Sequence, residues 1–251
     1  MSLHLLVLPV SSTRTVSSMH VVLFDIDGTL VLKRSTETNE RERFRRAVAK
    51  VAGRSPPTEP WRYDGMVDPE ICRLLLIKAG LSQESVAKHL QAVIDQVGEI
   101  YLTMEKRPVL NEGVAELLRI LKTSPNHKLG VLTGNLSAVA EEKLRLTGIR
   151  EYFHVTFYSN GYFDRGDLVK DAVNNCVRKY GLPGSEAVTI IGDTPRDMVA
   201  ANTNHAKAIG VASGSYSESE LAEAGATAIF PSLTPCNELL DVLRVEIDQR
   251  R

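Results

Sequence analysis

The sequence of 251 residues is poor in cysteine and contains no long apolar run. Its three cysteines, Cys72, Cys176 and Cys236, are odd in number and far apart, and no C-x-x-C pair occurs. This spacing argues against a zinc ribbon or a thioredoxin-type motif and favours reduced, mostly buried thiols. The six histidines form no H-x-x-x-H or H-E-x-x-H pair, so a histidine-ligated metal site is not expected.

An excess of charge of either sign is also missing. The chain has 30 basic and 31 acidic residues and a formal net charge of −1, so it offers no basic field to nucleic acid. No apolar run approaches the roughly 20 residues that span a bilayer. With 17 glycines and 11 prolines, the composition differs from that of collagen or low-complexity disorder. We therefore expect a compact cytoplasmic protein, a monomer or weak dimer, with neither nucleic acid nor membrane as a partner.

Residues 1–18 lack the basic region and the longer apolar stretch of a secretory signal. The short apolar run of residues 3–10 contains Pro9, and Ser/Thr-rich text follows it. No acidic residue precedes Asp25, a bias that transit peptides share, so organellar targeting stays open as an alternative. We expect this segment to be an extended or disordered leader that carries no chemistry.

Short apolar runs alternate with helical patterns over much of the chain. Runs of this length are typical of strands buried on both faces of a parallel sheet. Their alternation with helices predicts an α/β fold, a Rossmann-like core in which a parallel sheet lies between two layers of helices. The predicted strands are residues 20–24, 128–132, 187–191, 206–211 and 226–230.

A long stretch after the first predicted strand has helical patterns and no convincing strand. The helical patterns cover residues 36–51, 69–79, 82–104 and 111–122. This stretch is too long for an ordinary crossover between neighbouring strands. We therefore expect an inserted, all-helical cap domain at residues 35–107, and a core domain made of residues 19–34 and 108–251.

Two carboxylates follow the first predicted strand, in the sequence DIDGTL. If the strand ends at Asp25 and the chain turns at Gly28, both Asp25 and Asp27 lie at the carboxyl edge of the sheet. Open α/β sheets bind their ligands at this edge. An EF-hand loop does not fit, because its fifth and twelfth positions would hold Thr29 and Thr36.

Two later strand ends carry further polar residues. Thr133, Gly134 and Asn135 offer a hydroxyl and backbone N–H groups to an anion, although, taken alone, they are better explained by an ordinary turn in which Asn135 caps the helix. Asp193 follows another apolar strand, and Asp197 lies one turn into the next predicted helix. Clustered carboxylates repel one another, so a divalent cation is their natural partner.

In this order, the polar segments resemble the motifs of the haloacid dehalogenase superfamily in its phosphatase branch, including phosphoglycolate-phosphatase-like members. The D-x-D-G-T motif is matched from Asp25, the Thr or Ser at a strand end by Thr133, and G-D-x-x-x-D by Gly192 to Asp197. A further motif of the superfamily is a Lys or Arg before a helix. Arg165 lies directly before a predicted helix and is preferred to Lys170, although the common K-P-x-P text is absent.

The resemblance implies a Mg²⁺-dependent phosphatase that hydrolyses a small phosphorylated metabolite through an aspartyl-phosphate. Asp25 would be the nucleophile, and Asp27 would protonate the leaving group and then activate water. The expected Mg²⁺ ligands are Asp25, the backbone carbonyl of Asp27, Asp193 and Asp197. The expected phosphate ligands are Thr133, Gly134, Asn135 and Arg165.

Several alternatives stay open at this point. Asp27 favours phosphate esters over halides, because the dehalogenases of the superfamily typically lack this second acidic residue. The motifs do not separate a phosphatase from a phosphosugar mutase, and a phospho-accepting receiver domain or a catalytically silent binding protein are further alternatives. In capped members the cap supplies selectivity. The candidates here are Trp61, Arg62, Tyr63 and Asp68, although the two aromatics could belong to a cap core and Asp68 could N-cap a helix.

Overall fold

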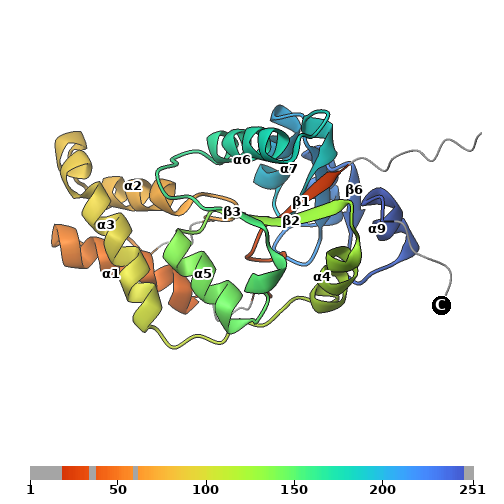
Figure 1. The fold of residues 1–251 in the computed structure, drawn as a ribbon. Coiled ribbons are helices and arrows are strands. Elements are labelled where there is room, and N and C mark those ends of the chain that lie inside the picture. The colour runs from red at the N-terminus through yellow and green to blue at the C-terminus, as the bar shows by residue number, and fades with distance from the viewer. Residues whose placement is uncertain (1–18, 34–37, 59–61, 246–251) are drawn as a thin grey trace, which may run out of the picture.

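The computed structural model describes residues 19–33, 38–58 and 62–245. These residues form a six-stranded parallel sheet in the order β3-β2-β1-β4-β5-β6, with helices on both sides (Figure 1). The predicted Rossmann-like α/β class is therefore confirmed. The strands are β1 (His20–Phe24), β2 (His127–Leu132), β3 (Val155–Phe157), β4 (Val188–Gly192), β5 (Lys207–Val211) and β6 (Ala228–Phe230).

The three layers follow from alternation along the buried central strand. Val22 and Phe24 of β1 point into one apolar core, and Val21 and Leu23 point into another on the opposite face. The first core is completed by α4 (Val114–Thr123), α5 (Ser137–Leu146) and α9 (Asn237–Val242). The second is completed by α6 (Arg165–Tyr180), α7 (Pro195–Thr203) and α8 (Glu218–Glu223).

The chain adds strands first on one side of β1 and then on the other. Strands β2 and β3 extend the sheet on one side of β1, and β4, β5 and β6 extend it on the opposite side. The carboxyl ends of β1 and β4 therefore lie beside a topological switch point, the usual ligand-binding crevice of open α/β sheets. The carboxylates that follow these two strands lie at this crevice.

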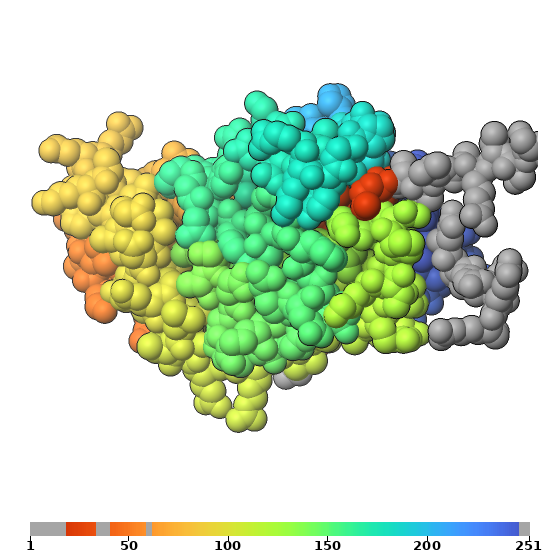
Figure 2. Space-filling view, viewed as in Figure 1, coloured from red at the N-terminus to blue at the C-terminus, as the bar shows by residue number. Residues whose placement is uncertain are grey.

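Three helices between β1 and α4 form a separate apolar cluster, and we call them the helical block. They are α1 (Thr38–Ala52), α2 (Asp68–Lys78) and α3 (Gln83–Thr103). In the space-filling view their orange and yellow atoms gather at one end of the molecule (Figure 2). None of the helices that the structure describes is long and apolar enough to cross a bilayer.

Several elements differ from the sequence prediction. The short strand β3 and the short helix α9 were not predicted, and the helix expected from residue 111 begins at Val114. Asn111 does not continue the helix, because its side chain donates hydrogen bonds to the carbonyls of Gly28 and Thr29, at 2.8 and 2.9 Å. Gly113 then provides the N-cap in a left-handed conformation, with φ of 78°.

His20 begins β1 at the edge of the sheet opposite the carboxylates. It is buried, and neither ring nitrogen has a hydrogen-bond partner within the part of the chain that the structure describes. Burial, assisted by the charges of Arg244, His127 and Lys207, lowers the pKa of His20 to about 4.

This lowered pKa predicts a loss of stability in mild acid. The unfolded chain binds a proton at His20 near pH 6.5 and the folded chain near pH 4, so the free energy of unfolding falls as the pH decreases through this window. We expect His20→Phe, which keeps a ring at this position, to remove part of this decline. Urea unfolding between pH 7 and 4.5 measures the free energy of unfolding of both proteins. If this free energy depends on pH identically in the variant and the wild type, the prediction is contradicted.

Candidate active site

The D-x-D-G-T motif forms a tight turn after β1. Gly28 has φ of 88°, and a Cβ added to it would lie 2.1 Å from Oδ2 of Asp193. Only glycine therefore lets this turn approach the residue that follows β4. Asn111 and Ser213 fix the turn, because both donate to the Gly28 carbonyl. Sequence reasoning missed these two residues, since their role depends on segments that are distant in the chain.

Three carboxylates converge beyond β1 and β4. Oxygens of Asp25, Asp193 and Asp197 all lie within 4.8 Å of one another, and the three side chains are buried. Burial raises the pKa of Asp193 well above its usual value, and it raises the pKa of Asp25 to about 6 against the opposing charge of Arg165. The charged form of this cluster therefore needs a cation.

Asp193 fits a metal ligand best among them. Neither of its carboxylate oxygens has a hydrogen-bond partner among the described residues, and the nearest ammonium, that of Lys33, lies 3.8 Å from Oδ2. Buried polar groups without partners are costly, so a buried carboxylate of this kind fits the role of a metal ligand. Hard carboxylate oxygens are the donors that a divalent cation such as Mg²⁺ prefers.

Asp197 has two partners of its own. Its Oδ2 accepts from the backbone and hydroxyl of Thr194, at 3.2 and 2.7 Å, in a capping box that starts α7. Its Oδ1 forms an ion pair with Arg165. Asp197 therefore completes the capping box of α7 and belongs to the acidic cluster at the same time.

Arg165 joins the acidic cluster to the start of α6. It is buried, and its Nη2 lies 3.2 Å from Oδ1 of Asp25. Burial alone would lower the pKa of Arg165, but the charges of Asp197 and Asp25 outweigh it and raise the pKa. Lys170, the other candidate cation, is exposed further along α6. The structure thus brings Arg165, and not Lys170, to the carboxylates.

The segment after β2 lies against Asp27 of the first motif and against the helical block. Thr133 is fully buried, and its hydroxyl accepts from the backbone and side-chain N–H groups of Asn135. The carbonyl of Gly134 accepts from the backbone of Asp68 at 2.7 Å. A Cβ at Gly134 would lie 2.3 Å from the carbonyl of Met66, so glycine permits this close approach.

Asp27 is held through both of its oxygens. Oδ2 accepts from Nδ2 of Asn135 at 2.7 Å, and Oδ1 accepts from Nζ of Lys143 at 2.5 Å. Burial would raise the pKa of Asp27, but the ammonium of Lys143 and these hydrogen bonds lower it. Sequence reasoning missed Lys143. Its signal was present, because Lys143 is in phase with the buried positions Val139 and Ala140 of α5.

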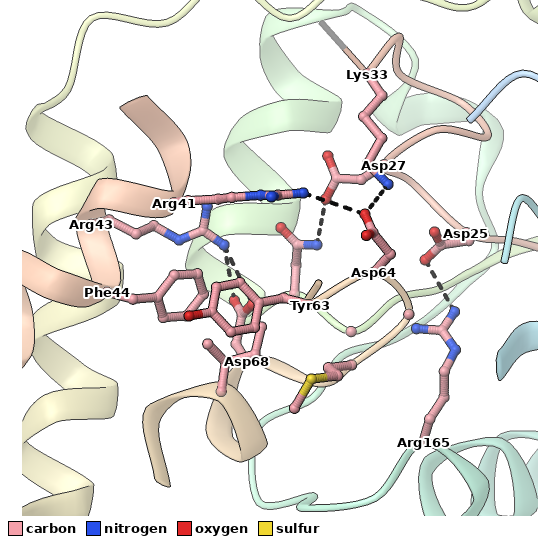
Figure 3. Close-up of a pocket in the computed structure, with 15 residues that line it drawn as sticks. Asp25, Asp27, Lys33, Arg41, Arg43, Phe44, Tyr63, Asp64, Asp68 and Arg165 are labelled. Carbon is pink, nitrogen blue, oxygen red and sulfur yellow. Dashed lines mark hydrogen bonds and ion pairs between the residues drawn. The ribbon is translucent and has the colours of Figure 1, made fainter. Parts of the chain in front are cut away.

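A cavity of about 100 Å³ separates these groups from the helical block. Figure 3 shows Lys33, Arg41 and Asp64 near Asp27, and Arg43 beside Asp68 further into the block. The Lys33 ammonium lies 2.5 Å from Oδ1 of Asp64, and Arg41 lies 3.4 Å from the same oxygen. Cations and carboxylates thus alternate around the cavity.

The four candidate selectivity residues are placed differently. Tyr63 and Asp68 line the cavity, whereas Arg62 stacks over the ring of Tyr216 at 5.5 Å and is absent from the described lining residues. Trp61 lies outside the described residues. Asp68 does not N-cap α2, because Val67 occupies that position; instead its carboxylate accepts from the backbone of Leu136 at 2.9 Å.

Comparisons with known proteins find similar sequences and folds. A curated 5'-nucleotidase of Pseudomonas aeruginosa is 26% identical over 222 residues, which cover 88% of this chain and 95% of that protein. A structure described as a predicted phosphatase from Clostridium acetobutylicum superposes with a TM-score of 0.65 at 20% identity, covering 91% of this chain and 99% of that one. Another, described as a predicted phosphoglycolate phosphatase from Haemophilus somnus, gives 0.62 at 17% identity, covering 89% and 97%.

These two structures share the fold at low identity. The family model carries the stronger argument, because it matches residues 19–204 and so contains every motif placed above. The turn after β1, the strand end at Thr133, the cation at the start of α6 and the acidic pair after β4 all lie within the matched range. The chain belongs to the haloacid dehalogenase-like hydrolase family and is an enzyme of that family.

Proposed function

We propose that this hydrolase is a Mg²⁺-dependent phosphatase that cleaves a small-molecule phosphate monoester through an aspartyl-phosphate. The observation that carries the proposal is the convergence of Asp25, Asp193 and Asp197 at the carboxyl edge of the sheet, with Arg165 bound to two of them. The names of the relatives, a 5'-nucleotidase and phosphatases, support phosphate-ester chemistry.

Asp25 would act as the nucleophile. Its carboxylate attacks phosphorus, the bond from phosphorus to the ester oxygen breaks, and the phosphoryl group is transferred to Asp25. Asp25, Asp193 and Asp197 would hold Mg²⁺, with the Asp27 carbonyl as a further ligand. When bound, Mg²⁺ offsets repulsion between carboxylates and phosphate and stabilises charge in the transition state.

The remaining phosphoryl oxygens would be bound from two sides. The Thr133 hydroxyl and the backbone N–H groups of Gly134 and Asn135 would bind from the end of β2. Arg165 approaches from α6, where its contact with Asp25 keeps the guanidinium next to the reacting oxygen. Charged and preorganised donors of this kind stabilise the transition state without reorganising during the reaction.

Asp27 would move the protons. It donates a proton to the departing ester oxygen in the first displacement, and it takes one from the attacking water in the second. Its place two residues after Asp25, on the lining of the same cavity, suits both steps. Asn135 and Lys143 orient its carboxyl group.

The helical block would act as a cap, with boundaries near residues 35 and 107, and would contact the leaving group. Tyr63, Asp64 and Arg41 line the cavity from the block. The cavity of about 100 Å³ is below the several hundred Å³ of pockets for drug-sized ligands, which favours a small leaving group. We infer that the substrate is a small phosphorylated metabolite.

The proposal is tested by phosphate release from 4-nitrophenyl phosphate, followed by a panel of phosphorylated sugars, small acids and nucleotides. We expect release that requires Mg²⁺. A mutase would instead isomerise one sugar phosphate with little release, and a receiver domain would become phosphorylated without turnover. Absence of phosphate release from every ester would contradict the proposal.

A further inference from the structure

A buried lysine outside the family motifs contacts the proposed acid and base. Lys143 is 1% exposed, and its Nζ donates to Oδ1 of Asp27 at 2.5 Å. The same ammonium lies 5.7 Å from the ring centroid of Tyr101, a fully buried residue of α3. Lys143 therefore joins a catalytic candidate of the sheet domain to the helical block.

The helix that carries Lys143 belongs to two apolar cores. Leu136 and Val139, at the start of α5, pack into the cluster of the helical block. Ala140 and Leu144 pack into the core beneath the sheet. Figure 1 shows α5 between the helical block and the strands. A shift of the block relative to the sheet must therefore act on α5.

Tyr101 is the residue of the helical block whose ring lies near the Lys143 ammonium. Its ring faces three cations, with centroid distances of 4.8 Å to Lys106, 5.3 Å to Arg43 and 5.7 Å to Lys143. Cation–π contacts gain strength when they are desolvated, as here. Arg43 also pairs with Asp68, whose carboxylate binds the backbone at the start of α5. The block thus contacts α5 at both Leu136 and Lys143.

We propose that Lys143 is a positioning residue for Asp27, and that its contact with Tyr101 makes the placement of the Asp27 carboxyl depend on docking of the helical block. The inference rests on the proposed function, in which Asp27 protonates the leaving group. With the block docked, Tyr101 and Asp27 hold the ammonium between them, and the ammonium fixes one oxygen of Asp27 while Asn135 fixes the other.

This role has a kinetic signature that a purely structural role lacks. As the bond from phosphorus to the ester oxygen breaks, Asp27 gives its proton to that oxygen and the leaving group departs as a neutral alcohol or phenol. A leaving group that is stable as an anion does not need this proton. Misplacing Asp27 therefore slows poor leaving groups and spares good ones.

The test measures kcat/KM for 4-nitrophenyl, phenyl and 4-methoxyphenyl phosphate, which differ mainly in the acidity of the phenol. For Lys143→Met we expect a loss of about 10- to 100-fold on 4-methoxyphenyl phosphate and less than about 3-fold on 4-nitrophenyl phosphate. The slope of log kcat/KM against phenol pKa should become steeper. Lys143→Arg should restore part of the loss, because it keeps a cation near Asp27.

Tyrosine variants test the dependence on the helical block. Tyr101→Leu removes the ring face and should steepen the slope in the same direction, although Tyr101 itself does not line the cavity described above. Tyr101→Phe keeps the ring and should resemble the wild type. Arg145→Met is the matched control on α5, since Arg145 is an exposed cation paired with Glu142.

The outcomes are distinguishable. An unchanged slope in Lys143→Met, with activity on 4-nitrophenyl phosphate retained, would overturn the positioning role. A steeper slope in Lys143→Met but not in Tyr101→Leu would overturn the dependence on the block. If Lys143→Met fails to fold, Lys143→Gln and Lys143→Arg provide the same comparison. An unchanged slope in Asp27→Asn would instead contradict the proposed function.

Discussion

Replacement of Asp25 with asparagine is expected to abolish turnover, with a loss in kcat/KM for 4-nitrophenyl phosphate of at least about 10⁴-fold. Asparagine has nearly the same shape as aspartate but offers no carboxylate to attack phosphorus. The buried ion pair with Arg165 is also lost, although Arg165 keeps its contact with Asp197. Phosphate release by both proteins under saturating Mg²⁺ measures the effect.

A covalent readout separates a lost nucleophile from general damage. Acid quenching of the wild type during turnover should trap a phosphoryl group on the peptide that contains Asp25, and Asp25→Asn should trap none. Asp167→Asn is the matched control, because Asp167 is an exposed aspartate of α6. Retention of more than about a tenth of the activity in Asp25→Asn would rule out the aspartyl-phosphate route.

Replacement of Asp193 with asparagine is expected to have opposite effects on activity and on stability without metal. Activity should fall by at least about 100-fold, because a ligand of the proposed metal is lost. The metal-free protein should melt at a higher temperature, because a buried carboxylate that has no hydrogen-bond partner among the described residues is replaced by a neutral amide. At this chain length about 1 kcal/mol corresponds to about 2–4 °C.

The sign of the stability effect follows from the raised pKa of Asp193. The folded, metal-free protein retains the proton at higher pH than the unfolded chain, so stability is greatest below the unfolded pKa and is lost as the pH rises through the folded one. The gain from Asp193→Asn should therefore be larger at pH 7.5 than at pH 4.5. Thermal unfolding of EDTA-treated proteins at both values measures it.

Added Mg²⁺ should reverse the order of the two proteins. A ligand at 100 times its Kd stabilises a folded protein by about 2.7 kcal/mol, so the wild type should gain several degrees and Asp193→Asn little or nothing. Manganese and calcium salts are the comparison ions. A wild-type melting temperature that no divalent cation changes would contradict a metal site at this cluster.

The strands that could be predicted from the sequence are those that are buried on both faces of the sheet. Runs such as residues 20–24 and 187–191 are continuously apolar because helices cover both sides of the central sheet. Strand β3 was missed because it has three residues at the sheet edge, of which only Val155 is buried. Its position is set by pairing with β2, which local sequence does not encode. The boundaries of the inserted domain stay a prediction.

In the candidate site too, residues with a local sequence signal were predicted and residues that depend on distant segments were not. Asp25, Thr133 and Asp193 could be located from sequence because each directly follows a buried strand, and parallel strands end at a common edge. Lys33 and Lys143 could not, since their partners, Asp64 and Asp27, lie far away in the chain. The sequence contains one indication of Lys143, because it is a charged residue on the apolar face of a helix. Such a residue is worth examining wherever an acidic motif is expected nearby.

The central place of β1 has a consequence for synthesis of the protein. This strand leaves the ribosome before the other strands of the described sheet, yet its neighbours in the sheet begin at His127 and Val188. At typical translation rates β4 follows β1 by roughly ten to thirty seconds. Until β2 emerges, the apolar segment HVVLF has no partner strand and is exposed apolar surface of the kind that chaperones protect, while the helices that follow it can already pack on one another. The edge that bears the carboxylates is therefore completed late, only after β4 has emerged.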